Sequence, residues 1–342
     1  MGVAGLDICI YESRPDNAIG IKLLVLSIAQ HEPAARLHLF IDHMGAKLRT
    51  WLLGQPNVTL DHLECDPALG WNVKPKHLLH LLSNGLTSVI WFDSDIIVTR
   101  PFRQLVTAGT DKTLILAEEY FAYRNQGVAV RTAGWGLPPG RDLSFTPNTC
   151  ILRTSQAHCS LLRAWQDLLD REDYVALQGK FWSERPFYMI GDQDALSALL
   201  GSREFMDIQV RRLRRGHDIA QCFGADGYRP MERIAALWRG MPPFVHAQGE
   251  KPWHGASSKR VDQSLSPYRL IATAYASLLE PDERTWLLAD EGIARVLRSI
   301  SGGHPAVSGL APSAAARIKK RHQAIWRLIR AAGRRTRVGV GI

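Results

Sequence analysis

The feature that most constrains this chain is an apolar segment interrupted by two acids. Residues 89–92 and 96–98 are apolar, and Asp93-Ser94-Asp95 lies between them. Runs rich in β-branched and aromatic residues are typical of a strand covered on both faces. A carboxylate is costly to bury without a partner. We therefore expect a central strand within residues 88–102, kinked at acids that share a divalent cation. The alternative is a strand end whose acids cap a neighbouring helix.

The surrounding pattern predicts an α/β fold. Strand-like segments at 7–12, 36–42, 57–63, 113–119 and 148–152 alternate with helix-like segments at 19–30, 46–53, 75–82 and 155–169. Such alternation favours right-handed βαβ units and a mostly parallel sheet. Ligands bind such sheets at the carboxyl ends of the strands, where the two acids fall. Residues 120–147 are expected to form a long loop, and 268–279, 283–289 and 292–300 are expected to be helical.

The positive charge is concentrated in the C-terminal segment. The 342 residues carry a net charge of +9, yet eleven Lys and Arg and no acid follow Glu291, so residues 1–291 carry +9 − 11 = −2. Within residues 316–337, apolar residues form one helical stripe opposite a basic face. This pattern favours a helix lying on an anionic membrane. The alternatives are a disordered basic tail and nonspecific contact with nucleic acid. No motif for specific nucleic-acid recognition accompanies it.

The cysteines and the hydropathy indicate a compartment. Five cysteines, an odd number without a CxxC pair, argue against a disulfide framework or a zinc site. The N-terminus has no signal-peptide pattern, and no apolar run of about 18 residues exists. We expect a cytoplasmic protein, peripheral on the inner face of the plasma membrane.

Four segments together resemble a known family. They are Asp93-Ser94-Asp95, Asn148-Thr149, Asp192-Gln193-Asp194 and His246 with the Gly249, Lys251-Pro-Trp sequence after it. In this order they are similar to the nucleotide-sugar glycosyltransferases of GT-A fold, most of all glycosyltransferase family 8, which includes glycogenin-like and bacterial lipopolysaccharide galactosyl- and glucosyltransferases. The resemblance spans residues 7–254.

The resemblance implies a GT-A, Rossmann-like mixed sheet that is mostly parallel and flanked by helices, with a C-terminal helical extension. Residues 1–264 would form the catalytic domain, 265–300 the C-terminal helices, and 301–342 a linker and basic amphipathic tail.

The resemblance also implies a metal site. Asp93, Asp95 and His246 would bind Mn²⁺ or Mg²⁺ on the donor diphosphate, and an imidazole ligand favours Mn²⁺. Gly249 would let the backbone approach the phosphates, and Lys251 would reach a diphosphate oxygen. Here the chain departs from the family, because it has one residue fewer between Gly249 and Lys251. The missing residue lies before Lys251 and after His246, so it affects the expected position of Lys251 more than that of His246.

Further donor contacts follow from the same resemblance. Lys76 would bind donor phosphate or sugar, with Lys74 as the alternative. Asn148 would bind sugar hydroxyls. Tyr11 and Glu12, at the end of the first strand, would hold the nucleobase.

Asp192 and Gln193 are the implied catalytic residues. Asp192 would hydrogen-bond donor sugar hydroxyls, and Gln193 would lie opposite the leaving group. The alternative for Asp192 is a plain helix N-cap.

The implied function is metal-dependent, retaining transfer of a hexose from a UDP-sugar to a lipid-linked or cell-surface glycan. Front-face attack by the acceptor is expected, with a transient adduct on Asp192 or Gln193 as the minor alternative. Two other functions stay open: an inverting GT-A transferase with an Asp base, and a non-catalytic, membrane-associated binder of nucleotide sugars. The sequence names neither the sugar nor the acceptor.

Overall fold

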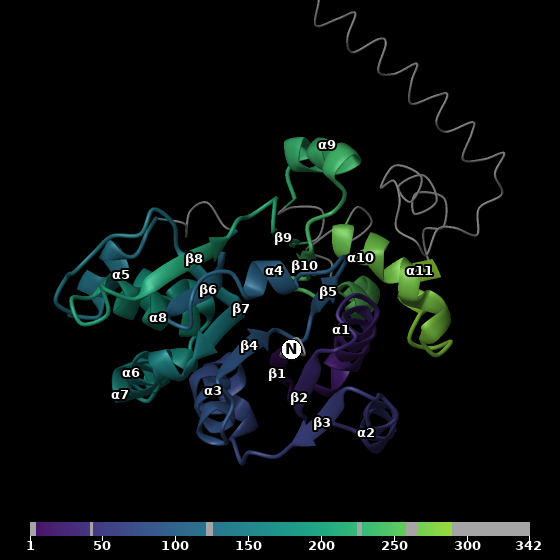
Figure 1. Cartoon of the computed structure of the whole chain (residues 1–342), viewed down its shortest axis with the longest axis horizontal. Helices are drawn as coiled ribbons and strands as arrows, with labels where there is room; N and C mark the ends of the chain where they lie inside the picture. Colours follow the sequence, from purple (N-terminus) through teal and green to yellow (C-terminus); the bar gives the residue numbers. More distant parts are fainter. Residues whose placement is uncertain (1–4, 42–43, 121–125, 224–227, 258–265, 289–342) are drawn as a thin grey trace, which may run out of the picture.

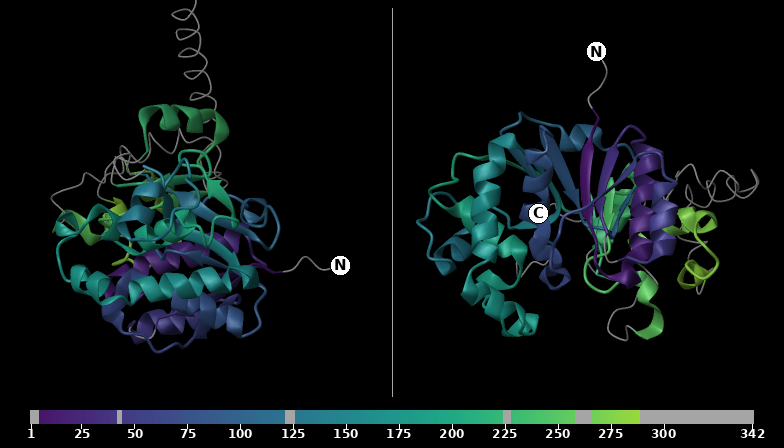
Figure 2. Two further views of the ribbon diagram at one scale, coloured as in Figure 1. Left: turned by 90° about the vertical axis from the view of Figure 1, so that its left-hand side faces the viewer. Right: turned by 90° about the horizontal axis from the view of Figure 1, so that it is seen from below.

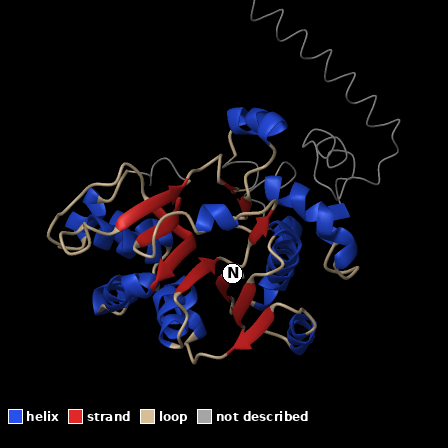
Figure 3. Ribbon diagram, viewed as in Figure 1, coloured by secondary structure: helices blue, strands red, loops and turns tan. Residues whose placement is uncertain are grey.

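The computed structural model describes residues 5–41, 44–120, 126–223, 228–257 and 266–288. Its centre is a seven-stranded sheet (Figures 1 and 3). In spatial order the strands are β3 (Val58–Asp61), β2 (Arg36–Phe40), β1 (Asp7–Tyr11), β4 (Ser88–Phe92), β7 (Pro147–Ser155), β6 (Thr113–Glu118) and β8 (Gln209–Leu213). Only β7 runs antiparallel to its neighbours. The predicted α/β class with a mostly parallel, mixed sheet is confirmed.

The expected single central strand is wrong. The apolar segment forms two strands in two different sheets: β4 in the large one, and β5 (Ile96–Val98) in a second, three-stranded sheet. In the second sheet, β10 (Phe244–His246) pairs antiparallel with β5 and parallel with β9 (Ile219–Gln221). The backbone changes sheet at the two acids. Asp93 N–H donates to Cys150 O on β7 (2.8 Å), while Asp95 O accepts from Ala247 N–H (3.0 Å) after β10.

Helices cover both faces of the large sheet (Figure 2). Alternate residues of β1 divide between the faces, because successive strand side chains point in opposite directions. Ile8 and Ile10 pack in a cluster with α1 (Ala18–His31) and α2 (Ala46–Leu53). Cys9 packs on the opposite side. There the cover is α3 (Lys74–Ser83), α6 (Cys159–Leu169) and α8 (Asp192–Gly201). The first five predicted elements lie within about two residues of the observed ones.

The second half of the chain differs more from expectation. The expected loop 120–147 contains α5 (Ala129–Gly134), and α7 (Glu172–Gln178), β8, β9 and α9 (Pro230–Arg239) were not predicted. The edge strand β8 is rich in arginine, and its Arg211 and Arg212 are exposed. Charged side chains are common on edge strands, where they oppose pairing with another chain.

The remaining elements complete the fold. A short α4 (Arg103–Val106) follows β5, and 3-10 turns lie at Pro15–Asn17, Pro67–Val73, Gln156–His158, Trp182–Glu184, Phe187–Met189 and Pro252–Ser257. At the C-terminal end, the expected helix 268–279 is α10 (Pro267–Ala272) followed by a 3-10 turn (Thr273–Leu278), and α11 (Thr285–Leu288) replaces the expected 283–289.

The expected helix 292–300 and the linker and basic amphipathic tail expected at 301–342 lie outside the described residues. Among the described helices, none has the length and apolar character needed to cross a bilayer.

Candidate active site

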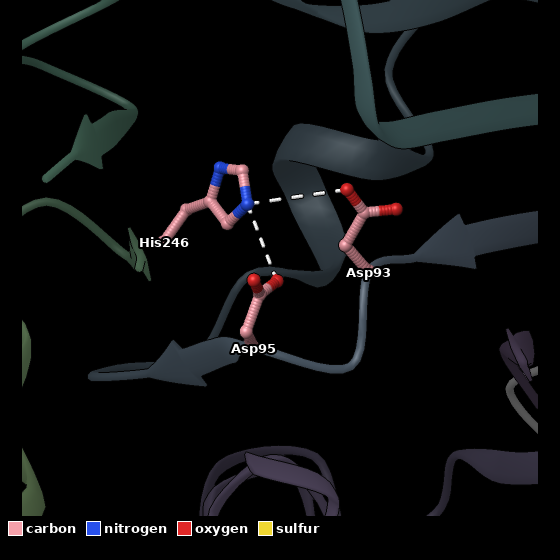
Figure 4. A group of neighbouring side chains, drawn as sticks. All are labelled: Asp93, Asp95 and His246. Atoms are coloured by element: carbon pink, nitrogen blue, oxygen red, sulfur yellow. Dashed lines mark ion pairs between the residues drawn. The ribbon is translucent and has the colours of Figure 1, made fainter. Parts of the chain in front are cut away.

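Three side chains that offer metal ligands meet where the two sheets join (Figure 4). Asp93 and Asp95 lie in the connection between β4 and β5, and His246 ends β10 opposite Ile96. His246 Nε2 lies 3.2 Å from Asp95 Oδ1 and 3.9 Å from Asp93 Oδ2. One ligand atom from each residue falls within 4.8 Å of the others. The predicted trio is therefore brought together by strand pairing across about 150 residues of chain.

The donor set fits a divalent transition metal. An imidazole beside two carboxylates favours Mn²⁺ over Mg²⁺, because Mg²⁺ prefers oxygen ligands alone. Asp95 and His246 are buried, and Asp93 is partly open, with 27% of its side chain exposed. Asp95 Oδ1 is buried and faces His246 Nε2, so these two ligand atoms already point toward one another.

The connection holding the acids is fixed by hydrogen bonds to Trp91 and Glu12. Trp91 Nε1–H donates to Asp93 Oδ1 (2.8 Å). Ser94 Oγ–H donates to Glu12 Oε2 (2.5 Å), and the same carboxylate accepts from the side chains of Asn17 and Arg14. Glu12 is buried, and although burial alone would raise its pKa, Arg14 and these hydrogen bonds hold it below its usual value.

The contact of Glu12 with a nucleobase stays a prediction, and the structure shows its carboxylate engaged elsewhere. Its carboxylate points inward and anchors the acidic connection, because β1 ends beside β4 in the sheet. Tyr11, the residue before it, lies half-buried with its ring 4.9 Å from the ring of His77.

Lys251 contacts the acidic cluster directly. Its ammonium is buried, pairs with Asp95 and donates to Ala247 O (2.8 Å). Burial opposes ionisation of Asp95, but Lys251 and then His246 lower its pKa well below the usual range. Burial likewise opposes protonation of His246, yet the Asp95 carboxylate raises its pKa to about 10.

Gly249, expected at the phosphates, is exposed and has φ of +76°, a conformation that favours glycine.

The structure places Lys74, not Lys76, at the site. Lys74 Nζ is buried, 3.1 Å from Asp93 Oδ1 and 3.3 Å from Asp192 Oδ2, and donates to Thr149 Oγ1 (2.9 Å). Burial would lower the pKa of Lys74, but Asp192 and Asp93 raise it above its ordinary value. Lys76 is exposed and donates to Glu64 O (2.8 Å), so the structure brings Lys74 rather than Lys76 to the acidic cluster. Two residues apart on a helix, the lysines point about 200° apart.

Asp192 opens α8 without capping it. The N-cap is Gly191, whose N–H donates to Asp194 Oδ2 (3.0 Å). Asp192 Oδ2 instead accepts from Thr149 Oγ1 (2.7 Å) and pairs with Lys74. Burial raises the pKa of Asp192, and Lys74 offsets part of that effect. The plain N-cap alternative is therefore wrong for Asp192.

Gln193 and Asn148 meet at a buried acid. The Gln193 amide donates to Glu119 Oε2, and Asn148 Nδ2 lies 3.4 Å from the same oxygen. Asn148 lies opposite Ala117, at the irregularity in the pairing of β6 with β7. Such bulges re-aim side chains and are frequent beside active sites. The structure thus brings Asn148 and Gln193 to the same buried carboxylate.

Glu119 was missed. Thr149 was named only as part of the Asn148-Thr149 segment, and Lys74 only as the alternative to Lys76. For Lys74 a signal existed, because it precedes Leu78 and Leu81 by four and seven residues and so shares their buried helical face. Glu119 had none, since only the pairing of β6 with β7 brings it to Asn148.

Comparison with known proteins identifies the fold. No protein-family model and no curated protein matches the sequence. Solved structures with similar folds include the galactosyltransferase LgtC in complex with donor and acceptor sugar analogues, with 15% identity and a TM-score of 0.53 over 83% of this chain and 100% of that one. An active-site mutant of LgtC gives 15% identity and a TM-score of 0.50 over the same shares.

A further similar structure is the bifunctional glycosyltransferase WbbM in its apo form, with 15% identity and a TM-score of 0.52. The match covers 73% of this chain and 47% of WbbM, so the present chain spans about half of that protein. These likenesses confirm the GT-A fold that the sequence resemblance implied.

Proposed function

We propose that this protein is a metal-dependent, retaining glycosyltransferase that moves a hexose from a UDP-sugar to a lipid-linked or cell-surface glycan. One observation carries the proposal: Lys74 joins the cation cluster to the first turn of α8, contacting Asp93 on one side and Asp192 on the other. A diphosphate needs cations, and a sugar needs buried hydrogen-bonding groups. Here the two kinds of group lie together in a fold that known glycosyltransferases use.

The residues divide into two roles. Asp93, Asp95 and His246 would hold Mn²⁺ or Mg²⁺, which as a Lewis acid stabilises charge on a departing diphosphate. Lys74 adds a second, fixed positive charge beside Asp93. Because it is buried and already oriented by Thr149, it needs little reorganisation when charge develops.

The sugar-binding role falls to the Asn148, Asp192 and Gln193 group. A carboxylate accepts several hydrogen bonds, so Asp192 can also accept from sugar hydroxyls. Glu119 holds the Gln193 side-chain amide in place. Asp192 is tied to Lys74 and Thr149, which makes it a poor nucleophile. We therefore favour front-face attack by the acceptor hydroxyl over a covalent adduct. Analysis of the anomeric configuration of the product by NMR tests this, since an inverted product would refute it.

A nucleotide-release assay tests the proposal as a whole. The full chain would be incubated with UDP-, GDP- and TDP-sugars, with Mn²⁺, Mg²⁺ or chelator, beside Asp95→Asn and the surface control Asp282→Asn. We expect metal-dependent UDP release from one sugar, lost in Asp95→Asn and kept in the control. Metal-dependent UDP binding without release or transfer, even with glycan acceptors present, would make the protein a binder. Absence of any nucleotide binding would refute the proposal.

The membrane part of the proposal concerns location and acceptor. We propose a peripheral protein on the inner face of the plasma membrane, held by the basic tail 316–337. The support is the amphipathic, acid-free sequence of that segment, whose affinity for anionic lipid would place the site near a lipid-linked acceptor.

A further inference from the structure

The helix α9 exposes a row of large apolar side chains. Met231, Ile234 and Trp238 have 72%, 42% and 53% of their surface exposed. Their spacing of three and four residues places them on one helical face. Ala236, which packs against the core of the second sheet, lies on the opposite face at about 100° per residue. The exposed apolar row therefore lies on the face of α9 opposite Ala236.

The position of α9 makes this row accessible. Figure 1 shows α9 set apart from the other described elements, beyond β9 and β10, and the left view of Figure 2 agrees. Its attachment is made by its other side. Arg233 donates to Tyr228 O (2.9 Å), and Glu232 lies 3.7 Å from Arg215 in the turn after β8.

The charge around α9 is opposite to that of the remaining body. Residues 209–240 hold seven arginines and three acids, a net charge of +4. Since residues 1–291 total −2, the other residues of that region total −6. Exposed arginines lie at both ends of the helix, Arg229 and Arg239, and on the neighbouring edge strand, Arg211 and Arg212. A basic patch on an acidic body selects an anionic partner.

We infer that α9 is an interfacial helix that seats the catalytic body on an anionic lipid surface. An exposed apolar row flanked by arginines is the pattern of a helix lying at the boundary between headgroups and acyl chains. Charge complementarity favours lipid over a second copy of this chain, because two such patches would repel one another. This contact differs from the one proposed for the basic tail, and it does not depend on catalysis.

Vesicle partitioning of the full chain tests the inference. The probes are vesicles of mixed phosphatidylglycerol and phosphatidylcholine and of phosphatidylcholine alone. The test variant replaces Met231, Ile234 and Trp238 by Ser, and a leucine variant at the same three positions keeps the apolar row. The matched control replaces three exposed apolar residues on other elements by Ser: Leu53, Val175 and Leu278.

We expect the serine variant to lose about tenfold or more in partition coefficient for anionic vesicles, and the control and leucine variants to bind like the wild type. All variants keep the tail, so unchanged binding of the serine variant would overturn the inference. A concentration-dependent dimer that the serine variant abolishes, seen by sedimentation without lipid, would also overturn it and assign the face to a second copy. Because no sugar nucleotide is used, failure here is distinguishable from failure of the proposed transferase activity.

Discussion

Replacing Lys74 by Met should destabilise the protein in a pH-dependent way. The substitution removes a buried ammonium that lies 3.3 Å from Asp192 and 3.1 Å from Asp93. Asp93 is partly exposed and can hydrate, whereas Asp192 is buried and cannot. Breaking a buried ion pair from one side costs about 3–5 kcal/mol.

The cost is limited by protonation of Asp192. Adding a proton to a carboxyl of ordinary pKa 3.8 costs about 4 kcal/mol at pH 7 and about 2 kcal/mol at pH 5, at about 1.36 kcal/mol per pH unit. A carboxyl whose pKa is raised by folding binds a proton in the folded state, so stability falls as pH rises above its unfolded pKa. Loss of Lys74 raises that pKa further. The deficit of the variant should therefore be about 4 kcal/mol at pH 7 and no more than about 2 kcal/mol at pH 5.

Urea denaturation followed by circular dichroism at pH 5 and pH 7, with chelator present, measures both values. Lys76→Met is the matched control, because that lysine is exposed and its loss should change stability by about 0.5 kcal/mol or less. Equal deficits at the two pH values would refute the role of Asp192. A larger effect at Lys76 than at Lys74 would refute the placement of α3.

Three further predictions concern single side chains. Arg131→Met leaves the fully buried Asp194 without its 2.7 Å partner, and we expect a loss of about 3–5 kcal/mol in the free energy of unfolding by urea denaturation; an unchanged midpoint would contradict it. Trp91→Phe removes the hydrogen bond that orients Asp93, and we expect Mn²⁺ affinity by titration calorimetry to fall about tenfold or more. Wild-type affinity would exclude that orienting role. Gly249→Ala places a side chain at a residue of positive φ, beside an aromatic ring. We expect the free energy of unfolding, measured by thermal denaturation, to fall by about 1–3 kcal/mol. Wild-type stability would indicate that this turn relaxes.

The sequence predicted the first half of the fold well, because its signals are local. The helix Ala46–Leu53 has the predicted bounds, and the first strands and helices differ from prediction by few residues. Periodicity of apolar residues sets such elements before any long-range contact forms. Later elements were missed where their identity depends on pairing. The three-residue strand β9 and the arginine-rich β8 are strands because β10 and β6 lie beside them.

The sequence also determined the chemistry of the candidate site. Asp93 and Asp95 were singled out by their apolar surroundings, and the family resemblance added Asn148, Asp192, Gln193 and His246. The structure brings these residues into two adjoining groups. A carboxylate flanked by apolar residues is costly to bury without a partner. The inference that Asp93 and Asp95 bind a cation therefore required no tertiary information.

Tertiary structure alone decided which neighbouring charges belong to the site. It places Lys74 rather than Lys76 beside Asp93. It also brings the Glu12 carboxylate to Ser94 and pairs Lys251 with Asp95. Each contact depends on which face of a helix or strand packs against a segment far away in sequence. Side chains one position apart on a strand, or two apart on a helix, point in nearly opposite directions. Spacing fixes the set of candidates, and packing between distant segments fixes which side chain reaches the site.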